Sequence, residues 1–390
     1  PRPSQSLTLS NTGRGDLIVR AVECGEGLST PLEPGLAVPP GGSARIEVRL
    51  DPSADGYGAR SSFLLLVTND PLRPMRRIRA TAVIEERHTN GNDTITMYPI
   101  LEKRALAEQI WLMKILAPRV ARSARPGQFV IVRADERGER IPLTISDYDA
   151  AEGSVTLVIQ AIGASTRKIC ALGEGDALAD FAGPLGRPSE FVSTPPEELR
   201  RKRFLFVAGG VGAAPVYPQV KWLHERGVAA DVIVGAKTRG MLIYTEPMRA
   251  VAGQLHIATD DGSEGDKGLV TQVLERLVGE QGRRYDECIA IGPMVMMKFV
   301  ALATKKYGLK TTVSLNTLMV DGTGMCGACR VTVGGRTRFT CVEGPEFDGH
   351  EVDFDEAMRR QGMYRNEEQR AAAIEAEREA GHQCKIGLDK

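Results

Sequence analysis

The sequence predicts a multidomain protein of the β plus α/β class. Its 390 residues exceed what one hydrophobic core usually organises, so several domains are expected. Short apolar runs separated by Gly, Pro and Asn turns precede Phe204, and this pattern is typical of antiparallel sheets. After Phe204, strand patterns alternate with helical patterns, which indicates a parallel sheet with crossover helices.

Residues 1–84 are predicted to form a β-sandwich of the immunoglobulin type, because SLTLSNTG, DLIVRAV, SARIEVRL, SSFLLLVTNDP and RRIRATAVI alternate with turns. LSNTG, PPGGSARIEVRLDP and LVTNDPLRP resemble turns of bacterial immunoglobulin-like domains related to the abnormal-spindle and hydin repeats, which are usually interaction modules. Cys24 is expected to be a small, partly buried side chain. Residues 85–93, EERHTNGND, lack apolar periodicity and are the predicted linker.

Residues 94–198 are predicted to form a β-barrel. The segments TITMYPILEKRALAEQIWLMKILAP, QFVIVRADERGERIPLTISD and GSVTLVIQAIG are dense in strand-forming residues. The Pro-rich, charged run STPPEELRRKR separates this barrel from the next domain.

Residues 199–312 are predicted to form a parallel α/β domain that binds a nucleotide. FLFVAGGVGAAPVYP places Gly209, Gly210 and Gly212 between a strand and a helix, with Pro215 in the first helical turn. Glycines allow close approach to a phosphate, and the helix N-terminus supplies unpaired N–H groups. The alternative is a strand-to-helix turn without a ligand.

The nucleotide pattern differs from a plain dinucleotide fingerprint. It is G-x-G-x-x-P instead of G-x-G-x-x-G, and no acidic residue ends the second strand. That position reads GAKTRG, whose cations suit a 2'-phosphate, while TDDGS and IGP follow two further strands at the ligand-binding edge of an open sheet. The additional candidate residues are Lys237, Arg239, Asp260, Asp261, Gly292 and Pro293.

A barrel followed by a nucleotide domain is the order of the ferredoxin-reductase superfamily, which this chain resembles. RIPLT resembles the superfamily's strand motif of Arg, an apolar or aromatic residue and Ser or Thr, which holds a flavin phosphate and ring. Arg140 lies one residue early in that spacing, and such a slip turns a side chain to the other face of a strand, whereas Thr144 keeps the register. The resemblance implies FAD, with Arg140, Pro142, Leu143 and Thr144 as candidate contacts.

Two further segments belong to the predicted flavin site. GASTRKI opens a short helix with Gly163, Ser165 and Thr166, which suits a pyrophosphate, and Arg167 is either a phosphate partner or a solvated charge. GPLG, which begins at Gly183, resembles the turn at the end of the superfamily's flavin barrel and is otherwise a common turn.

The segment VDGTGMCGACRVTVGGRTRFTC, within a predicted subdomain at residues 313–354, has the spacing of an iron-sulfur site. Plant-type 2Fe-2S clusters use C-x4-C-x2-C and a distant Cys. Cys326 and Cys329 provide C-x2-C, and RVTVGGRTRFTC is predicted to be a hairpin that returns Cys341 to them. Counting back from Cys326 puts Asp321 in the place of the first thiolate, so the predicted ligands are Asp321, Cys326, Cys329 and Cys341.

Other ligand sets stay open at this point. A zinc site also uses C-x2-C but needs a second paired half. Cys170, Cys288 and Cys384 are rival fourth ligands, although Cys288 lies in an apolar strand and Cys384 in a charged helical tail predicted for residues 355–390.

The barrel motif, the nucleotide loop and VDGTGMCGAC together resemble the small subunit family of NADH-dependent ferredoxin:NADP+ oxidoreductase and sulfide dehydrogenase. The resemblance runs from residue 94 through FTCVEGPEFDGHEVDF to MYRNEEQ. In that family the aspartate of the motif is a cluster ligand, which implies this role for Asp321. The electron-transfer subunit of dihydroorotate dehydrogenase, which normally supplies four cysteines, is a weaker match.

The resemblance implies an oxidoreductase subunit that exchanges hydride between NAD(H), with NADP(H) possible, and FAD. Electrons would then pass singly through the 2Fe-2S cluster to a larger partner subunit with its own FAD and 4Fe-4S clusters, coupling NADH, NADPH and ferredoxin by electron bifurcation. No catalytic side chain is expected, because the cofactors carry the chemistry. The alternatives are a dihydroorotate dehydrogenase or other flavoprotein partner, and an interaction protein with a degenerate reductase domain.

Composition narrows the setting. The 50 basic residues balance the 50 acidic ones, so nucleic acid is not an expected partner. No apolar run is long enough for a membrane span, and no basic-then-apolar leader is seen. Seven cysteines, three of them crowded together, indicate redox or metal chemistry in a reducing compartment, so a cytoplasmic location is expected.

Overall fold

The structure is a computed structural model that describes residues 4–24, 28–50, 58–71, 74–84, 97–368 and 370. The chain divides into two compact units, Pro1–Thr94 and Ile95–Lys390. The predicted linker at residues 85–93 and Cys384 lie outside the described residues. Within the described part of the chain, no helix has the length and apolar character needed to cross a membrane.

The first unit contains two antiparallel sheets, in the orders β1-β5-β3 and β4-β2-β6-β7. Ile46 and Val48 on one sheet share a buried core with Leu64 and Leu66 on the other. Alternate residues of each strand therefore face a common interior. The strands are β1 (Ser4–Ser10), β2 (Leu17–Cys24), β3 (Leu28–Ser29), β4 (Ala37–Val38), β5 (Ser43–Leu50), β6 (Gly58–Thr68) and β7 (Met75–Ile84).

Two asparagines explain the turn motifs of this unit. Asn11, in LSNTG, is buried, and its Nδ2 donates to the carbonyls of Gly15 and Val38 at 2.8 and 2.7 Å. Asn69, in VTNDP, accepts from the N–H of Ile18 at 2.7 Å. Both side chains replace missing backbone partners, which accounts for the choice of Asn at these turns.

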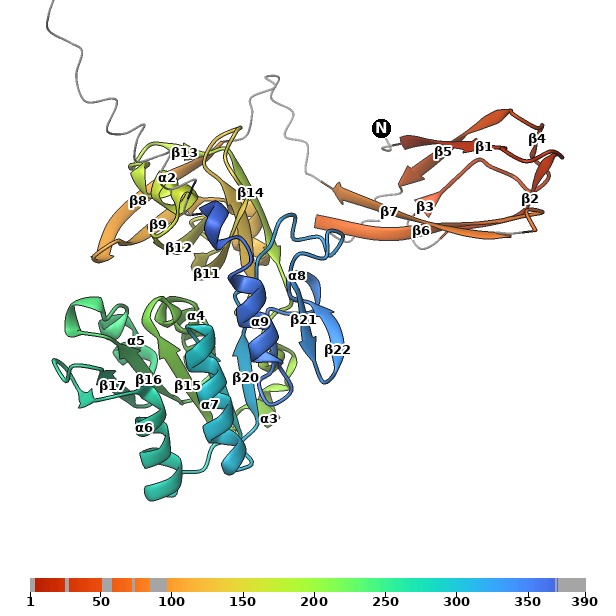
Figure 1. Cartoon of the computed structure of the whole chain (residues 1–390). Coiled ribbons are helices and arrows are strands. Elements are labelled where there is room, and N and C mark those ends of the chain that lie inside the picture. Colours follow the sequence, from red (N-terminus) through yellow and green to blue (C-terminus); the bar gives the residue numbers. More distant parts are fainter. Residues whose placement is uncertain are drawn as a thin grey trace, which may run out of the picture. The chain divides into compact units, whose positions relative to one another are not determined.

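The second unit begins with a barrel-like antiparallel sheet of seven strands, in the order β13-β8-β9-β12-β11-β10-β14 (Figure 1). Its interior is filled by alternating apolar side chains, including Met113, Val130 and Leu157. The elements are β8 (Tyr98–Ala107), β9 (Ile110–Leu116), α1 (Pro118–Ser123), β10 (Phe129–Arg133), β11 (Ile141–Asp149), β12 (Ser154–Gln160), α2 (Ala164–Ala171), β13 (Ala177–Leu178), β14 (Asp180–Leu185) and α3 (Pro196–Leu199).

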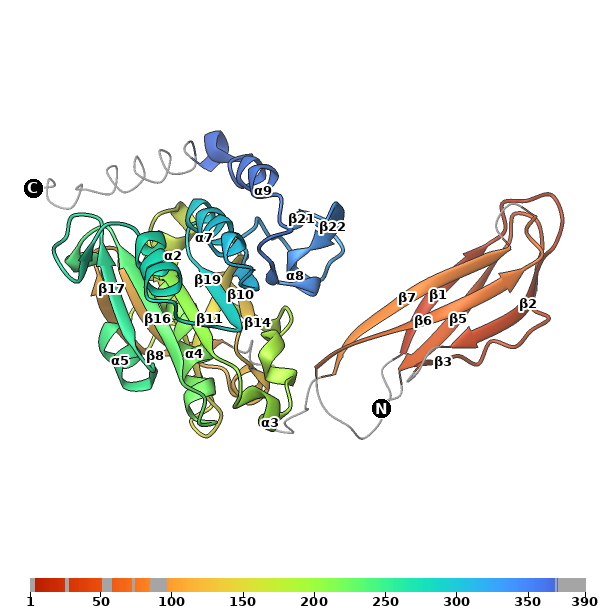
Figure 2. The ribbon, with the colours of Figure 1, turned by 90° about the horizontal axis from the view of Figure 1, so that it is seen from below.

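The nucleotide domain is an open sheet in the order β18-β17-β16-β15-β19-β20-β23, parallel except for its last strand. Figure 2 shows these strands between α4 and α5 on one side and α7 on the other. Apolar residues on both faces make β15 a fully buried strand. The elements are β15 (Phe204–Gly209), α4 (Ala213–His224), β16 (Ala230–Ala236), α5 (Thr245–Val251), β17 (Leu255–Thr259), β18 (Asp266–Lys267), α6 (Val270–Glu275), β19 (Glu287–Ile291), α7 (Met294–Lys306) and β20 (Thr311–Ser314).

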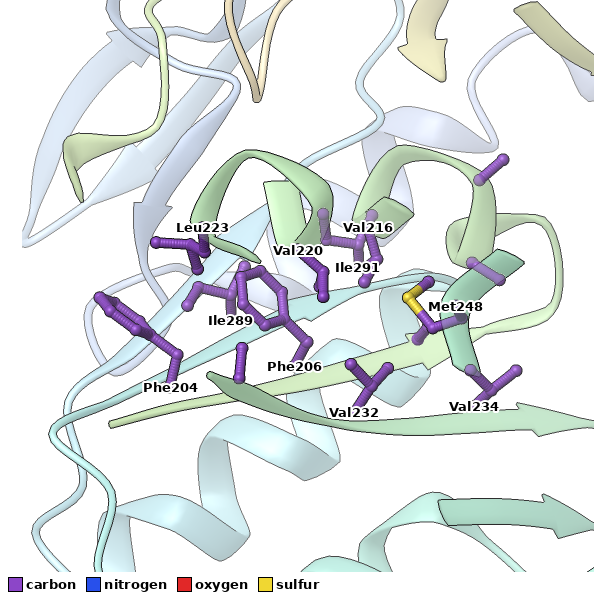
Figure 3. Close-up of a cluster of buried hydrophobic side chains, with 14 of the residues drawn as sticks. Phe204, Phe206, Val216, Val220, Leu223, Val232, Val234, Met248, Ile289 and Ile291 are labelled. Carbon is purple, nitrogen blue, oxygen red and sulfur yellow. The ribbon is translucent and has the colours of Figure 1, made fainter. Parts of the chain in front are cut away.

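Each face of the nucleotide sheet has its own core. Phe204 and Phe206 of β15 pack with Val220 and Leu223 of α4 (Figure 3). On the opposite face, residues such as Leu205 pack beneath α6 and α7. Alternation along one strand therefore fixes the position of α4, whose N-terminus follows the glycine loop.

The cysteine segment is built onto the nucleotide sheet. After β20, the chain forms the loop and the β21–β22 hairpin, and β23 then returns antiparallel to β20, with Ser314 opposite Glu346. The predicted division between residues 312 and 313 thus falls inside β20. The elements are β21 (Arg330–Val333), β22 (Arg336–Phe339), α8 (Thr340–Glu343), β23 (Glu346–Asp348) and α9 (Phe354–Gln361), and α9 lies beside the hairpin (Figure 1).

Candidate functional site

The glycine loop of the nucleotide domain lies between two adjacent strand ends. β15 ends at Gly209, and α4 begins directly after Gly212. A Cβ added at Gly212 would lie 2.2 Å from the carbonyl oxygen of Ile291, so this loop rests on the end of β19. β15 and β19 are neighbours in the sheet. After β15 the chain adds β16 and β17 on one side, and β19 and β20 follow on the other side. The strand order therefore reverses between β15 and β19, and open α/β sheets bind ligands at such a switch point.

Several other residues predicted for this site lie in or next to the glycine loop after β15 and the loop after β19. Gly292 lies against Gly209, because a Cβ added at Gly292 would be 3.1 Å from the Gly209 Cα. Pro293 precedes the first residue of α7, and Pro215 lies in the first turn of α4. Gly210 has a φ of +55°, and it forms the turn between strand and helix.

The loops after β16 and β17 form a second wall at the same edge of the sheet. The N–H of Asp260 donates to Ala236 at 3.1 Å, and that of Asp261 donates to Lys237 at 3.3 Å. Hydrogen bonds from the hydroxyl and N–H of Ser263 hold the pKa of Asp261 below its usual value. Asp261 is therefore a carboxylate at neutral pH.

Arg239 already has partners on this wall. Its Nε lies 3.3 Å from Glu264 Oε2, and its backbone N–H donates to the Ser263 hydroxyl at 2.7 Å. Ser263 ends the TDDGS segment that the sequence placed at this edge, although it was not itself a candidate residue, and Glu264 carries no motif signal. Only the juxtaposition of the loops after β16 and β17 reveals them.

The predicted flavin strand is β11, which pairs with β10. Pro142, Leu143 and Thr144 lie opposite Ile131, Val130 and Phe129, respectively. Arg140 precedes the strand, and its guanidinium donates to Asp180 Oδ2 at 2.7 Å. The Arg140 side chain is thus paired with a carboxylate on β14, whereas the residues that follow it belong to the strand that pairs with β10.

A cavity of about 150 Å³ lies beside the N-terminus of α2. Gly163 has no side chain with which to cap this helix, and Thr166 Oγ1 accepts from the Gly163 N–H at 3.0 Å. Ser165 contacts the carboxylate of Glu139. The cavity is lined by Ala134, Arg137, Gly138, Glu139, Ile141, Ala164, Ser165, Lys168 and Ile169.

The side chains and N–H groups around this cavity suit a diphosphate. The cations Arg137 and Lys168 line the cavity next to the N–H groups that begin α2, and both features attract phosphate oxygens. Lys168 is paired with Asp135, and the Glu139 carboxylate contacts Ser165, so a bound diphosphate would have to displace these two carboxylates. Gly183 lies on β14, where an added Cβ would be 2.7 Å from Val130 Cγ1, so its role is to let β14 approach β10. The barrel residues therefore fit the phosphate portion of FAD.

The cysteine loop brings two of its thiols together. The Sγ atoms of Cys329 and Cys341 are 3.3 Å apart, and both residues are buried. The β21–β22 hairpin turns at Gly334 and Gly335, both with positive φ, as a two-residue hairpin turn requires. This hairpin is the one predicted from the sequence, and it carries Cys341 back to Cys329.

Burial, followed by the hydrogen bond with Cys329, raises the pKa of the Cys341 thiol to about 12. A hydrogen bond from the Gly324 N–H opposes this shift. Buried, adjacent thiols ionise together only when a cation compensates them. The short distance between the two Sγ atoms, and not the raised pKa, makes this pair a candidate for metal ligation.

The other two predicted ligands differ in exposure. Cys326 is exposed, and Asp321 Oδ1 accepts a hydrogen bond from the Thr323 N–H at 2.9 Å. Among the described residues, no three His, Cys, Asp or Glu side chains converge on one ion site. A 2Fe-2S cluster distributes its protein ligands over two irons, so two ligands per iron suffice. The donor set fits such a cluster better than a single tetrahedral zinc ion.

The cysteine loop packs directly on the barrel. Cys329 and Cys341 share one apolar cluster with Phe129 and Ile131 of β10. The same strand pairs with Pro142, Leu143 and Thr144 of the predicted flavin strand. One strand therefore separates the predicted flavin site from the predicted iron-sulfur ligands.

The rival thiols lie elsewhere. Cys170 is in the barrel core, where burial raises its pKa to about 11, and Cys288 is in the nucleotide core, where burial also raises its pKa. Neither belongs to the apolar cluster around Cys329 and Cys341.

A buried carboxyl joins three parts of this unit, and sequence reasoning missed it. Glu346 Oε1 on β23 accepts from Ser189 Oγ beside the barrel and from Gln219 Nε2 on α4, each at 2.9 Å. Burial raises the pKa of Glu346 to about 7, although the hydrogen bond from Ser189 opposes the shift. This carboxyl is therefore a titrating group at a structural junction.

Comparisons with known proteins agree with this arrangement. The iron-sulfur cluster binding domain of dihydroorotate dehydrogenase B matches residues 316–353. An uncharacterized protein in the adh 3' region of Clostridium beijerinckii is 59% identical over 275 residues, which cover 70% of this chain and 93% of that protein. A dihydroorotate dehydrogenase B (NAD(+)) electron transfer subunit homolog of Thermotoga maritima is 45% identical over 269 residues, covering 69% and 92%.

One solved structure is similar over nearly its whole chain. It belongs to the NADH-dependent reduced ferredoxin-NADP oxidoreductase, whose structure was described for flavin-based electron bifurcation. The identity is 42% and the TM-score 0.66, and the match covers 73% of this chain and 99% of that one. From this relationship and those above, the chain belongs to the family of dihydroorotate dehydrogenase B electron transfer subunits and their homologues.

Proposed function

We propose that this chain is the electron-transfer subunit of an NAD(P)H-dependent flavoprotein oxidoreductase of the ferredoxin-reductase type. The observation that carries the proposal is the position of β10, which contacts Cys329 and Cys341 through Phe129 and Ile131 and pairs with the predicted flavin strand. The family relationship supports FAD, a 2Fe-2S cluster and NAD(H) as the redox groups. When bound, FAD links the two-electron chemistry of the nicotinamide to the one-electron chemistry of the cluster.

The residues of the chain bind and orient these groups. Gly209, Gly210 and Gly212 let a dinucleotide phosphate approach the N-terminus of α4, and Gly292 and Pro293 form the facing loop. Gly163, Ser165 and Thr166 at α2 receive the FAD diphosphate, while Thr144 on β11 faces the flavin. No side chain need transfer a proton, because the redox groups carry the reaction.

The four predicted ligands divide into two pairs. The proximity of Cys329 and Cys341 supports their binding to one iron, which leaves Asp321 and Cys326 for the other. The apolar side chains of Phe129 and Ile131 exclude water from the space between β10 and the thiols. This water-free region between the predicted flavin site and the proposed cluster ligands would favour electron transfer between the two groups over side reactions with solvent.

A larger partner subunit receives the electrons. Cys326 is exposed. Met325 and Val320, which precede Cys326 and Asp321 respectively, are 71% and 59% exposed, so the loop presents apolar side chains next to two of the proposed cluster ligands. The resemblance of the cysteine motif to the small-subunit family implies a partner with FAD and 4Fe-4S clusters, through which ferredoxin is reached, and similarity to the NADH-dependent reduced ferredoxin-NADP oxidoreductase supports an electron-bifurcating complex. Asp321, in place of a fourth cysteine, supports the same assignment.

The alternative partner is a dihydroorotate dehydrogenase catalytic subunit, and the Thermotoga relative and the matched domain favour it. Purification of the complex from its native cells distinguishes the two proposals. Recovery of a larger iron-sulfur flavoprotein supports the bifurcating enzyme. Recovery of a dihydroorotate-oxidising subunit supports the alternative.

Spectroscopy of the anaerobically purified chain tests the proposed function itself. We expect flavin absorbance that bleaches on addition of NADH, an EPR signal of a reduced 2Fe-2S cluster, and iron in metal analysis. A colourless protein without iron would contradict the proposal and would favour an interaction protein with a degenerate reductase domain. Zinc in place of iron would contradict the cluster assignment alone.

We further propose that the first unit is an immunoglobulin-type docking module and that the protein acts in the cytoplasm, where free thiols persist. The two antiparallel sheets with a shared core support the first proposal. Deletion of residues 1–90 is expected to weaken assembly with the partner but to leave FAD and the cluster in place. Unchanged assembly of the shortened chain would contradict the docking role.

A further inference from the structure

Arg239 lies at the carboxyl end of β16, where a cation would normally suggest recognition of the 2'-phosphate of NADP(H). In this structure the Arg239 guanidinium instead lies 3.3 Å from the carboxylate of Glu264. We propose that Glu264 makes the dinucleotide site select NAD(H) over NADP(H) by occupying Arg239, an inference that rests on the proposed function of this site.

The position of Glu264 is set by its backbone. Thr259 is fully buried, and its Oγ1 donates to the carbonyl of Glu264 at 2.8 Å and accepts from the Glu264 N–H at 3.0 Å. The next residue, Gly265, has a φ of +69°, and a Cβ added there would lie 2.1 Å from the Ile257 carbonyl oxygen. The loop is therefore held against β17, which fixes the backbone of Glu264 at a position from which its carboxylate reaches Arg239.

The two loops are also joined to each other. The Arg239 N–H donates to Ser263 Oγ at 2.7 Å, and Ser263 Oγ donates to Asp261 Oδ1 at 2.6 Å. Since Asp261 N–H donates to the Lys237 carbonyl, Asp261 lies at the base of the same wall. A group bound at Arg239 would therefore meet the carboxylates of Glu264 and Asp261 together.

The chemistry of the two dinucleotides differs only at the 2'-position. NAD(H) carries a neutral hydroxyl there, which can donate to a carboxylate. NADP(H) carries a phosphate with a charge of roughly −1.5 to −2, which would displace Glu264 from Arg239 and remain close to both carboxylates. The Arg239–Glu264 pair is exposed and therefore weak, so we expect a preference for NAD(H) of up to about fivefold rather than complete exclusion.

The test uses the full chain and two probes, ADP-ribose and 2'-phospho-ADP-ribose, with dissociation constants measured by calorimetry. Glu264→Gln keeps the backbone bonds of the loop but removes the charge. We expect the affinity ratio to shift toward the phosphorylated probe by up to about fivefold in this variant, and the shift to shrink as salt rises. The KM ratio for NADH and NADPH should follow the same direction.

Arg239 provides the second arm. Because Glu264 occupies it, Arg239→Gln should change the probe ratio little in the native background but should remove most of the gain in the Glu264→Gln background. Glu275→Gln is the matched control, because it breaks another exposed ion pair of this domain, with Lys306 at 3.0 Å, away from the strand ends. We expect it to leave the ratio unchanged.

The outcomes separate this inference from the proposed function. If both probes bind the native chain and the ratio is the same in Glu264→Gln, the selectivity role is wrong while the dinucleotide site stands. An equal shift in Glu275→Gln would likewise overturn it, since the effect would then be nonspecific. If neither probe binds the native chain, the dinucleotide site itself is wrong, and this inference with it.

Discussion

Gly322 lies so close to Ile131 that a Cβ added at Gly322 would come within 2.6 Å of the Ile131 Cδ1 atom. Gly322 also has a φ of +73°, in the region that side chains disfavour. The positive φ and the close approach to Ile131 Cδ1 and to Leu185 Cδ1, at 2.9 Å, together explain why a glycine stands where the cysteine loop meets the barrel.

We predict that Gly322→Ala loosens the cysteine loop from the barrel. Backbone strain and the clash with Ile131 together should destabilise the holoprotein by about 2–3 kcal/mol. Iron content per chain and the rate of flavin-to-cluster electron transfer should fall together, as measured by metal analysis and by stopped-flow reduction with NADH.

Two controls isolate the clash from the strain. Gly335 has a φ of +70° with open space around it, so Gly335→Ala should cost only about 1 kcal/mol and keep the iron. Ile131→Val removes the nearer clashing atom and leaves Leu185 Cδ1 at 2.9 Å, so adding it to Gly322→Ala should restore part of the iron content. No rescue by Ile131→Val would show that the contact with the barrel is not what matters.

The second prediction concerns the role of Asp321 as a cluster ligand. Its carboxylate both accepts from the Thr323 N–H and stands in the proposed ligand position. Asp321→Ala should lose or destabilise the cluster, whereas Asp321→Cys should keep a cluster whose reduction potential is altered. EPR spectroscopy and redox titration measure these outcomes.

Asp321→Asn separates the ligand role from the turn. An asparagine oxygen can still accept from Thr323, so the loop should keep its shape while the iron loses an anionic ligand. Loss of the cluster in both Asn and Ala variants supports ligation. A cluster that is intact and unshifted in the Ala variant would point to another ligand, such as one supplied by the partner subunit.

The third prediction concerns pH. Because the pKa of Glu346 is raised from 4.5 to about 7 in the folded chain, the folded state holds this proton more tightly than the unfolded state does. The resulting stabilisation is present below about pH 4.5 and is lost as pH rises through about 7. Glu346→Gln cannot ionise, so its stability relative to the native chain should rise by about 2 kcal/mol between pH 5 and pH 8.

Chemical denaturation at the two pH values measures this difference. Glu152→Gln is a control of opposite sign, because hydrogen bonds from Ser154 and then Lys114 lower the pKa of Glu152. Removal of that carboxylate should cost stability as pH rises from 4 to 7. The same pH response in both variants would contradict the assignment to Glu346.

Much of the reductase unit could be predicted from its sequence, because its motifs combine local turns with regular spacing. The hairpin returning Cys341, the strand-to-helix glycine loop and the order of barrel and parallel sheet are confirmed by the structure. The comparisons confirm the electron-transfer family. The ligand and cofactor contacts stay predictions.

Other features depend on contacts that no local pattern encodes. Phe129 and Ile131 share a face of β10, but both faces of that strand are buried, so alternation does not show which one meets the cysteines. The partner of Arg140 is Asp180, 40 positions away. The three-residue strand β23 is too short for any periodicity, and it joins the nucleotide sheet only because β20 is there to pair with it.

The position of β23 has a mechanical consequence. The cysteine loop and hairpin grow from β20 and β23 of the nucleotide sheet, yet the buried thiols rest on β10 of the barrel. A rotation of the nucleotide domain relative to the barrel would therefore change the packing of the two thiols on Phe129 and Ile131. Because β23 pairs with β20, the contact between the buried thiols and the barrel depends on the position of the nucleotide sheet.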